Sequence, residues 1–290
     1  MMICKILKML AVTALLPEMA TYAQTDMDRN RHFSVSAGEF NFPAAQEKKK
    51  ENVGTVLTEL ASAALTGKVS KQLPQYTEAV KSAVMSGIGN AIRLDAVETG
   101  AATYIDFIAT ATISNISTTH KVEPSSTKGK PDQDYYRALI SVTVNLSDAA
   151  TGNVVDSRNF SIRESDLGWM SSQERTMDDA LSVLRHAVRK YYDSCFPLSA
   201  SIIERGDINK DKQKNVYIDL GSADSVTEGM QFDVYSVKMI AGREAKTLIG
   251  RVKIDKVMGD DISLCKVNKG DKQVKAALDN NEVLALVSHH

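Results

Sequence analysis

Two hydrophobic periodicities divide the chain into a helix-containing first part and a strand-rich last part. Three segments carry apolar residues at spacings of three and four, which predicts amphipathic helices: residues 53–65, 76–92 and 174–194. Three others alternate apolar and polar residues, which predicts strands: residues 103–116, 138–146 and 154–162. A short strand or extended entry is predicted at 33–42.

The predicted strands are separated by two kinds of connection. Residues 117–134 are polar and contain Pro124, Gly129 and Pro131, a composition typical of an exposed loop. Residues 148–153 have the chemistry of a tight turn, which predicts a β-hairpin. The first domain is therefore predicted to be α+β, with helices packed on a mainly antiparallel sheet.

The last part of the chain is predicted to be a small β-barrel. Residues 215–235, NVYIDLGSADSVTEGMQFDVY, read as a strand, a loop closed by Gly229 and a second strand. The pattern continues through five predicted strands: residues 216–220, 230–238, 246–257, 261–267 and 282–287. Closing such strands into a barrel leaves few exposed edges, and small barrels of this kind bind or dock other molecules.

Composition and length limit the possible classes of protein. At 290 residues the chain is long enough for about two domains of ~150 residues. It is 43% apolar and 24% charged with a net charge of −1, which is ordinary for a soluble globular protein. The totals give no sign of nucleic acid or of an acidic membrane surface as a partner, although totals do not reveal a local basic patch.

The start of the chain has the layout of a secretory signal peptide. The apolar run at 9–16 follows two lysines and precedes small residues at Ala20 and Ala23. The run is far shorter than the ~20 residues that span a bilayer. Cys4 lies in the charged leader and not at the cleavage point, so no lipid anchor is expected. The sequence therefore predicts a signal peptide at 1–24 and a soluble periplasmic protein without a transmembrane segment.

No motif for catalysis stands out. The chain has neither a nucleophile elbow nor a phosphate-binding loop, and no local spacing supports a Ser/His/Asp set. The sequence therefore predicts a protein that is not an enzyme and has no cofactor. Cys195 and Cys265 could form a disulfide in an oxidising compartment, or both could be small buried hydrophobic residues.

Oxygen-bearing side chains alternate over residues 207–213, as at the start of a calcium loop. The sixth position is Lys212 instead of glycine, and the twelfth is Ile218 instead of glutamate. A solvated interdomain linker explains the segment better, so no metal ligand is predicted, and a bound cation stays an alternative.

Trp169 and Met170 are the candidate contact with a partner. They lie in a predicted loop, and tryptophan is enriched at binding hot spots. A tryptophan that caps the core is the alternative interpretation.

The first domain resembles the periplasmic domain shared by CsgG, the Lpo activators of penicillin-binding proteins and the amino-terminal part of TolB. The similarity is carried by residues 88–98, 102–114 and 135–160, with Thr151 and Gly152 at the closing turn of the hairpin. These motifs specify fold far better than function. Pore formation, known for CsgG, is not implied, since the chain lacks the lipidated cysteine and an obvious pair of inserting hairpins.

The second domain resembles the carboxy-terminal SH3-like barrel of the flagellar assembly protein FlgT. The similarity is carried by residues 220–222, 228–230 and 232–235. Glycine usually stands in that pattern where this chain has Ser225. The predicted organisation is a signal peptide at 1–24, a CsgG/TolB-N-like α+β domain at 25–205 and an SH3-like barrel at 206–290.

Together these features predict an exported, non-enzymatic accessory or assembly protein of the cell envelope. Its expected partners are envelope proteins or further copies of the chain. One alternative is a regulator of a cell-wall synthase, like the Lpo activators. Another is a small-molecule-binding or hydrolytic protein with a site at the domain junction.

Overall fold

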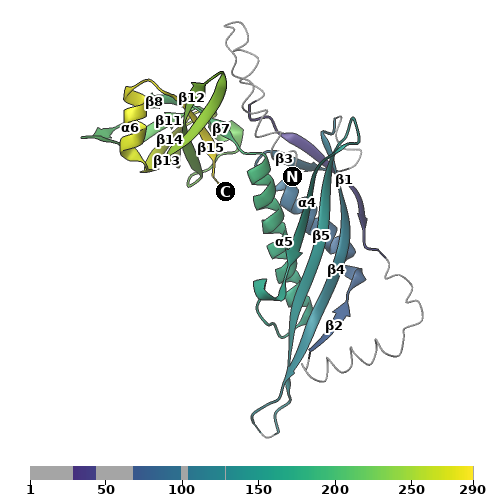
Figure 1. Ribbon diagram of the computed structural model, residues 1–290. Coiled ribbons are helices and arrows are strands. Elements are labelled where there is room, and N and C mark those ends of the chain that lie inside the picture. The colour runs from purple at the N-terminus through teal and green to yellow at the C-terminus, as the bar shows by residue number, and fades with distance from the viewer. Residues whose placement is uncertain (1–28, 44–67, 99–103, 128, 290) are drawn as a thin grey trace. The chain divides into compact units, whose positions relative to one another are not determined.

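The computed structural model describes residues 29–43, 68–98, 104–127 and 129–289, and nearly half of them lie in strands. The chain divides into two compact units (Figure 1), Phe33–Tyr192 and Asp193–His290, and residues 29–32 belong to the second unit. The predicted signal peptide and the predicted helix at 53–65 lie outside the described residues. No helix among the described residues is long and apolar enough to cross a membrane.

The first unit contains a six-stranded sheet in the order β3-β1-β4-β5-β6, with β2 also paired to β4. Its strands are β1 (Phe33–Asn41), β2 (Lys68–Gln72), β3 (Leu94–Val97), β4 (Phe107–Glu123), β5 (Gln133–Asp148) and β6 (Val154–Ile162). β1 runs parallel to β3 and β4, and the other pairs are antiparallel. Because β5 occupies one edge of β4 throughout, β1 and β2 share its other edge.

The predicted loop at 117–134 is wrong over much of its length, because β4 extends to Glu123 and β5 starts at Gln133. The polar residues of this part of β4 pair with β5 on one side and with β2 on the other. Ser117, Thr118 and Thr119 are buried there. Hydroxyl side chains are compatible with a strand whose backbone is paired on both edges, although their polarity alone suggested exposure.

Two long helices complete the first unit. α4 (Thr77–Gly89) follows a single 3₁₀ turn, η1 (Pro74–Tyr76), and contacts β1, β3 and β4. α5 (Gln173–Cys195) contacts β5 and β6 of the sheet. Its Thr176 hydroxyl accepts a hydrogen bond from the Ala138 N–H of β5 at 3.1 Å, and its Tyr191 hydroxyl donates to Asp156 of β6 at 2.9 Å. Both helices match their predicted positions.

The second unit is a seven-stranded antiparallel sheet in the order β7-β15-β12-β13-β14-β11-β8. Its strands are β7 (Ser199–Ala200), β8 (Ile202–Arg205), β11 (Asn215–Ile218), β12 (Gln231–Ile240), β13 (Arg243–Val257), β14 (Ser263–Lys269) and β15 (Val283–Ser288). The two edge strands, β7 and β8, are joined only by Ser201. The sheet is therefore nearly closed and barrel-like.

The boundary between the units differs from the predicted one at 205/206. Residues 193–205 belong to the second unit, because β7 pairs with β15 and β8 pairs with β11. The five strands predicted for the barrel are all present, as β11 to β15. Elements that were not predicted are β7, β8, and the short hairpin of β9 (Ile208–Asn209) and β10 (Lys212–Gln213). α6 (Asp271–Asp279) lies between β14 and β15 and buries Val274.

Ser225 adopts the left-handed backbone conformation that glycine adopts most easily, with φ 59° and ψ 22°. We expect Ser225→Gly to stabilise the second unit by roughly 0.5–1 kcal/mol, since a side chain is strained in this region of φ/ψ space. Thermal unfolding measures the shift. Ala223→Gly is the control, because Ala223 lies in the adjacent 3₁₀ turn with ordinary φ and should lose stability. If the two substitutions shifted the melting temperature equally, Ser225 would not be strained by its left-handed backbone conformation.

Candidate functional site

The predicted contact residues lie along the edge of β5, beyond the end of β6. β6 ends at Ile162, which pairs with Ile140. Further along the same edge, Met170 exchanges two backbone hydrogen bonds with Tyr136, at 2.7 and 3.0 Å. The segment that carries Trp169 is therefore fixed to the sheet like a short additional strand.

Trp169 is half-buried and lies against two cations. The Lys121 Nζ is 5.0 Å and the Arg137 guanidinium carbon 4.5 Å from the centre of the indole ring. The Lys121 Nζ is also 5.8 Å from the ring centre of Tyr135. These separations allow cation–π attraction. We call Lys121, Tyr135, Arg137 and Trp169 the Trp169 cluster.

The register of β4 and β5 explains how the cluster forms. Lys121 pairs with Tyr135, and Thr119 pairs with Arg137, so these four side chains project from one face of the sheet. Thr119 also donates a hydrogen bond to Glu164 at 2.8 Å, which attaches the start of the Trp169 segment to the same face.

The next residues along the two strands form a second polar–aromatic group on the opposite face. The His120 and Tyr136 rings stack with centres 4.7 Å apart, and the His120 Nε2 is 2.7 Å from a carboxylate oxygen of Asp134. Both faces at this end of the hairpin therefore combine aromatic rings with charged groups. Such surfaces suit recognition of a partner through stacking, hydrogen bonds and ion pairs.

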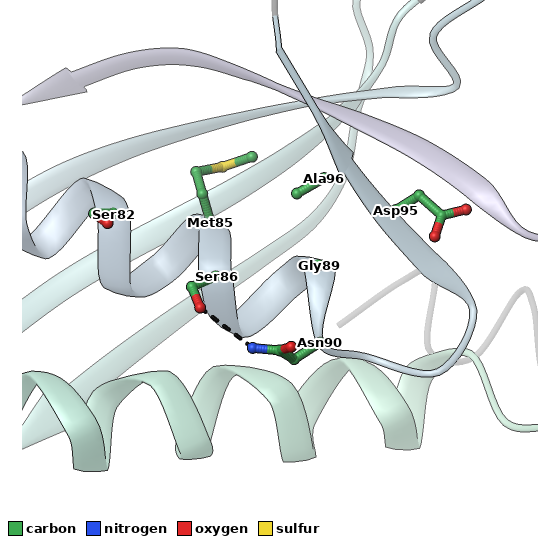
Figure 2. A pocket seen from close by; sticks show the side chains of 7 residues that line it. All are labelled: Ser82, Met85, Ser86, Gly89, Asn90, Asp95 and Ala96. Carbon is green, nitrogen blue, oxygen red and sulfur yellow. Dashed lines mark hydrogen bonds between the residues drawn. The ribbon is translucent and has the colours of Figure 1, made fainter. Parts of the chain in front are cut away.

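A shallow pocket of about 470 Å³ lies between α4 and β3. It is lined by Ser82, Met85, Ser86, Gly89, Asn90, Asp95 and Ala96 (Figure 2). The Asn90 amide donates to the Ser86 hydroxyl at 3.2 Å, whereas Figure 2 shows the Asp95 carboxylate turned away from both. The polar groups do not converge on one point, so the pocket has no arrangement of nucleophile and base.

The predicted linker at 207–213 forms the β9–β10 hairpin, and ion pairs attach it to α6. The Lys212 Nζ lies 2.9 Å from the Oδ2 of Asp271, and the Lys272 Nζ lies 2.5 Å from the Oδ2 of Asp211. A hydrogen bond from Lys272 lowers the pKa of Asp211, and a hydrogen bond from Lys212 lowers the pKa of Asp271. Among the described residues, no group of three or more His, Cys, Asp or Glu side chains could hold a metal ion.

We expect the ion pairs of α6 to make the second unit sensitive to acid. The pKa values of Asp211 and Asp271 are lowered in the folded state. Their ionised carboxylates therefore stabilise the fold above the unfolded-state pKa of about 3.9, and this stabilisation is lost as the pH falls through the folded-state pKa values. The melting temperature should decrease when the pH is lowered below about 4. The decrease should be smaller in the double variant Lys212→Gln/Lys272→Gln, which lacks both ion pairs. If the melting temperatures of the two proteins depended on pH in the same way below about pH 4, this expectation would be wrong.

Cys195 and Cys265 are both buried and are not joined to each other by a disulfide. Burial raises the pKa of the Cys265 thiol to about 12, with a smaller contribution from Asp255. A thiol with so high a pKa is a poor nucleophile, so Cys265 has the character of a small core residue.

No family model matches the sequence, and no curated protein matches it. Among the solved structures that are similar to the chain are the following two. Protein XCC0632 from Xanthomonas campestris, of family DUF330, has a TM-score of 0.27 and 10% identity, and the match covers 40% of this chain and 60% of that one. A putative neuraminyllactose-binding hemagglutinin homolog from Helicobacter pylori has a TM-score of 0.28 and 6% identity, and the match covers 57% of this chain and 84% of that one.

Proposed function

We propose that this protein is an exported, non-enzymatic accessory or assembly protein of the cell envelope. It acts in the periplasm by binding other envelope proteins through the Trp169 cluster of its first unit. The single observation that supports the proposal best is the half-buried Trp169, held against Lys121 and Arg137 at one end of the β4–β5 hairpin. The signal-peptide layout of residues 1–24 supports export.

We also propose a specific fold type for each of the two units. The first unit is an α+β domain of the CsgG/TolB-N type, with helices packed on a mainly antiparallel sheet. The contact of Thr176 with Ala138, and that of Tyr191 with Asp156, support this description. The second unit is an SH3-like barrel of the FlgT type, which the nearly closed sheet and the left-handed Ser225 at a glycine position of the pattern support.

The chemistry of the cluster favours protein recognition. Tryptophan and arginine are the residues most enriched at binding hot spots, and a partly buried ring offers a large apolar area at small entropic cost. The side chain of Lys121 keeps 30% of its surface exposed. A partner could therefore cover the ring and approach the cation together. Lys121 already forms an ion pair with Glu123, whereas Arg137 makes no ion pair with any described residue, so an acidic group on the partner would pair with Arg137.

Crosslinking in the native envelope, followed by purification of the tagged full chain, tests the proposal. We expect discrete protein partners, and we expect Trp169→Ala to lower their recovery about tenfold or more, the usual effect of removing a hot-spot tryptophan. The matched control is Val154→Ala on β6, since Val154 is 60% exposed and lies outside the cluster. Recovery that is unchanged by Trp169→Ala, or absence of any protein partner, would contradict the proposal.

A further inference from the structure

The hairpin of β12 and β13 projects beyond the strands on either side of it. β15 pairs with β12 only as far as Val237, and β14 pairs with β13 only from Arg251 onward. We call residues 238–248 the β12–β13 arm. Ala241 and Gly242 at its turn have φ values of 51° and 77°, which is the backbone of a tight hairpin turn.

Large apolar side chains gather on this arm. Met239 is 59%, Ile240 is 61% and Leu248 is 54% exposed. Met239 and Ile240 immediately precede the turn, where the arm extends furthest past its neighbours. Leu248 lies at the base of the arm, opposite Tyr235, which still pairs with β15. Single exposed apolar residues are normal on a protein surface, but two adjacent ones at a projecting turn indicate a site of contact.

Cations outnumber anions around these apolar residues: Arg243 lies directly across the hairpin from Ile240, and the single acidic residue, Glu244, lies across from Met239. The arm contains Lys238, Arg243 and Lys246 but only one acidic residue, Glu244. Lys238 lies 3.5 Å from Glu282, whereas Arg243 and Lys246 make no ion pair with any described residue. The near-neutral total charge of the chain conceals this local excess of cations.

We propose that the β12–β13 arm binds a lipid bilayer that contains anionic headgroups, with Met239 and Ile240 inserted among the headgroups and Arg243 and Lys246 at the phosphate level. An apolar tip with a local excess of cations has the chemistry of the membrane interface, where apolar burial and attraction to anionic lipid act together. Arginine and lysine can hold their charges at the headgroups while their stems cover apolar surface.

The composition of the arm favours lipid over protein. Protein–protein contacts are enriched in aromatic residues, methionine and arginine and depleted in lysine. The arm contains Met239 and Arg243, but it also has two lysines and no aromatic residue between 238 and 248. A narrow projecting turn also offers little flat area for a protein partner. Insertion of a few side chains into a deformable surface needs no such area.

Co-sedimentation of the full chain with vesicles tests the proposal. We expect binding to vesicles of phosphatidylethanolamine with phosphatidylglycerol, and much weaker binding to vesicles of phosphatidylcholine alone. Met239→Ser/Ile240→Ser should weaken binding to the anionic vesicles about tenfold, since each inserted apolar side chain contributes its own transfer energy. Arg243→Gln/Lys246→Gln should reduce the preference for anionic lipid and its sensitivity to salt.

The matched control is Met258→Ser/Ile262→Ser. These exposed residues flank the turn that follows β13, at the opposite end of the strand from the arm. The proposal is wrong if the full chain does not bind anionic vesicles, or if the control weakens binding as much as the arm variant does. It is also wrong if the arm substitutions leave vesicle binding intact and instead abolish a protein crosslink. Trp169→Ala should leave vesicle binding unchanged, which separates this proposal from the proposed function.

Discussion

Gly221→Ala is expected to destabilise the second unit by about 3 kcal/mol or more. A Cβ at this position would lie 2.3 Å from the carbonyl carbon of Asp260 and 2.4 Å from its oxygen. These are backbone atoms, so no side-chain rotation relieves the overlap. The two segments are also joined by hydrogen bonds of 3.0 Å from the N–H groups of Ser222 and Ala223. Separating the loops costs these bonds in addition to the strain of overpacking.

Urea unfolding followed by circular dichroism measures this loss. Gly259→Ala is the control, because a Cβ there would meet nothing within 4 Å and its φ is not positive. Trp169, the only tryptophan of the chain, reports on the first unit. Its fluorescence transition should therefore change less than the dichroism does. If Gly221→Ala and Gly259→Ala were equally stable, the backbone at Gly221 would not pack closely against that of Asp260.

Gly87→Val is expected to destabilise the first unit by roughly 3 kcal/mol. A Cβ on Gly87 of α4 would lie 2.7 Å from the carbonyl oxygen of Arg185 and 2.8 Å from the Cβ of Val188, both on α5. The two helices would have to move apart, and the strain of overpacking outweighs the ~1 kcal/mol by which glycine weakens a helix.

The fluorescence of Trp169 during urea unfolding measures the effect of this substitution. Ser82→Val is the matched control, because Ser82 is an exposed position of α4, where valine costs only a few tenths of a kcal/mol in helix propensity. If the two variants unfolded at the same urea concentration, α4 and α5 would not be in contact at Gly87.

Local patterns in the sequence identified the strands of the second unit but not how that unit closes. Val216 and Ile218, which alternate with polar residues in the first predicted strand, are both buried. Closure depends on β7 and β8, which are too short to show a period of two. Their strand character comes from pairing: β7 pairs with β15, which lies far away in the sequence, and β8 pairs with β11, which follows the β9–β10 hairpin.

The candidate site could be predicted only in part for a similar reason. Trp169 was conspicuous as the sole tryptophan, but its contacts depend on the pairing of Lys121 with Tyr135. The proline- and glycine-containing stretch between these residues predicted a loop that would have begun before Lys121. Only the extension of β4 and β5 brings Lys121 and Arg137 to one face of the sheet, next to the indole.

The apolar tip of the β12–β13 arm was also hidden in the sequence. Met239 and Ile240 continue a predicted strand, where they would be expected to be covered on at least one side. Their exposure follows from the early ends of the pairing with β15 and β14, at Val237 and Arg251. No local pattern specifies where a neighbouring strand stops.

Site-specific photocrosslinking in intact envelopes tests most directly whether the Trp169 cluster binds a protein partner. A photoreactive phenylalanine analogue replaces Tyr135, which belongs to the cluster, or Val154, which does not. We expect a discrete protein adduct from position 135 that disappears when Trp169→Ala is added, and no such adduct from position 154. The absence of an adduct at position 135, or an adduct that persists without Trp169, would contradict the account.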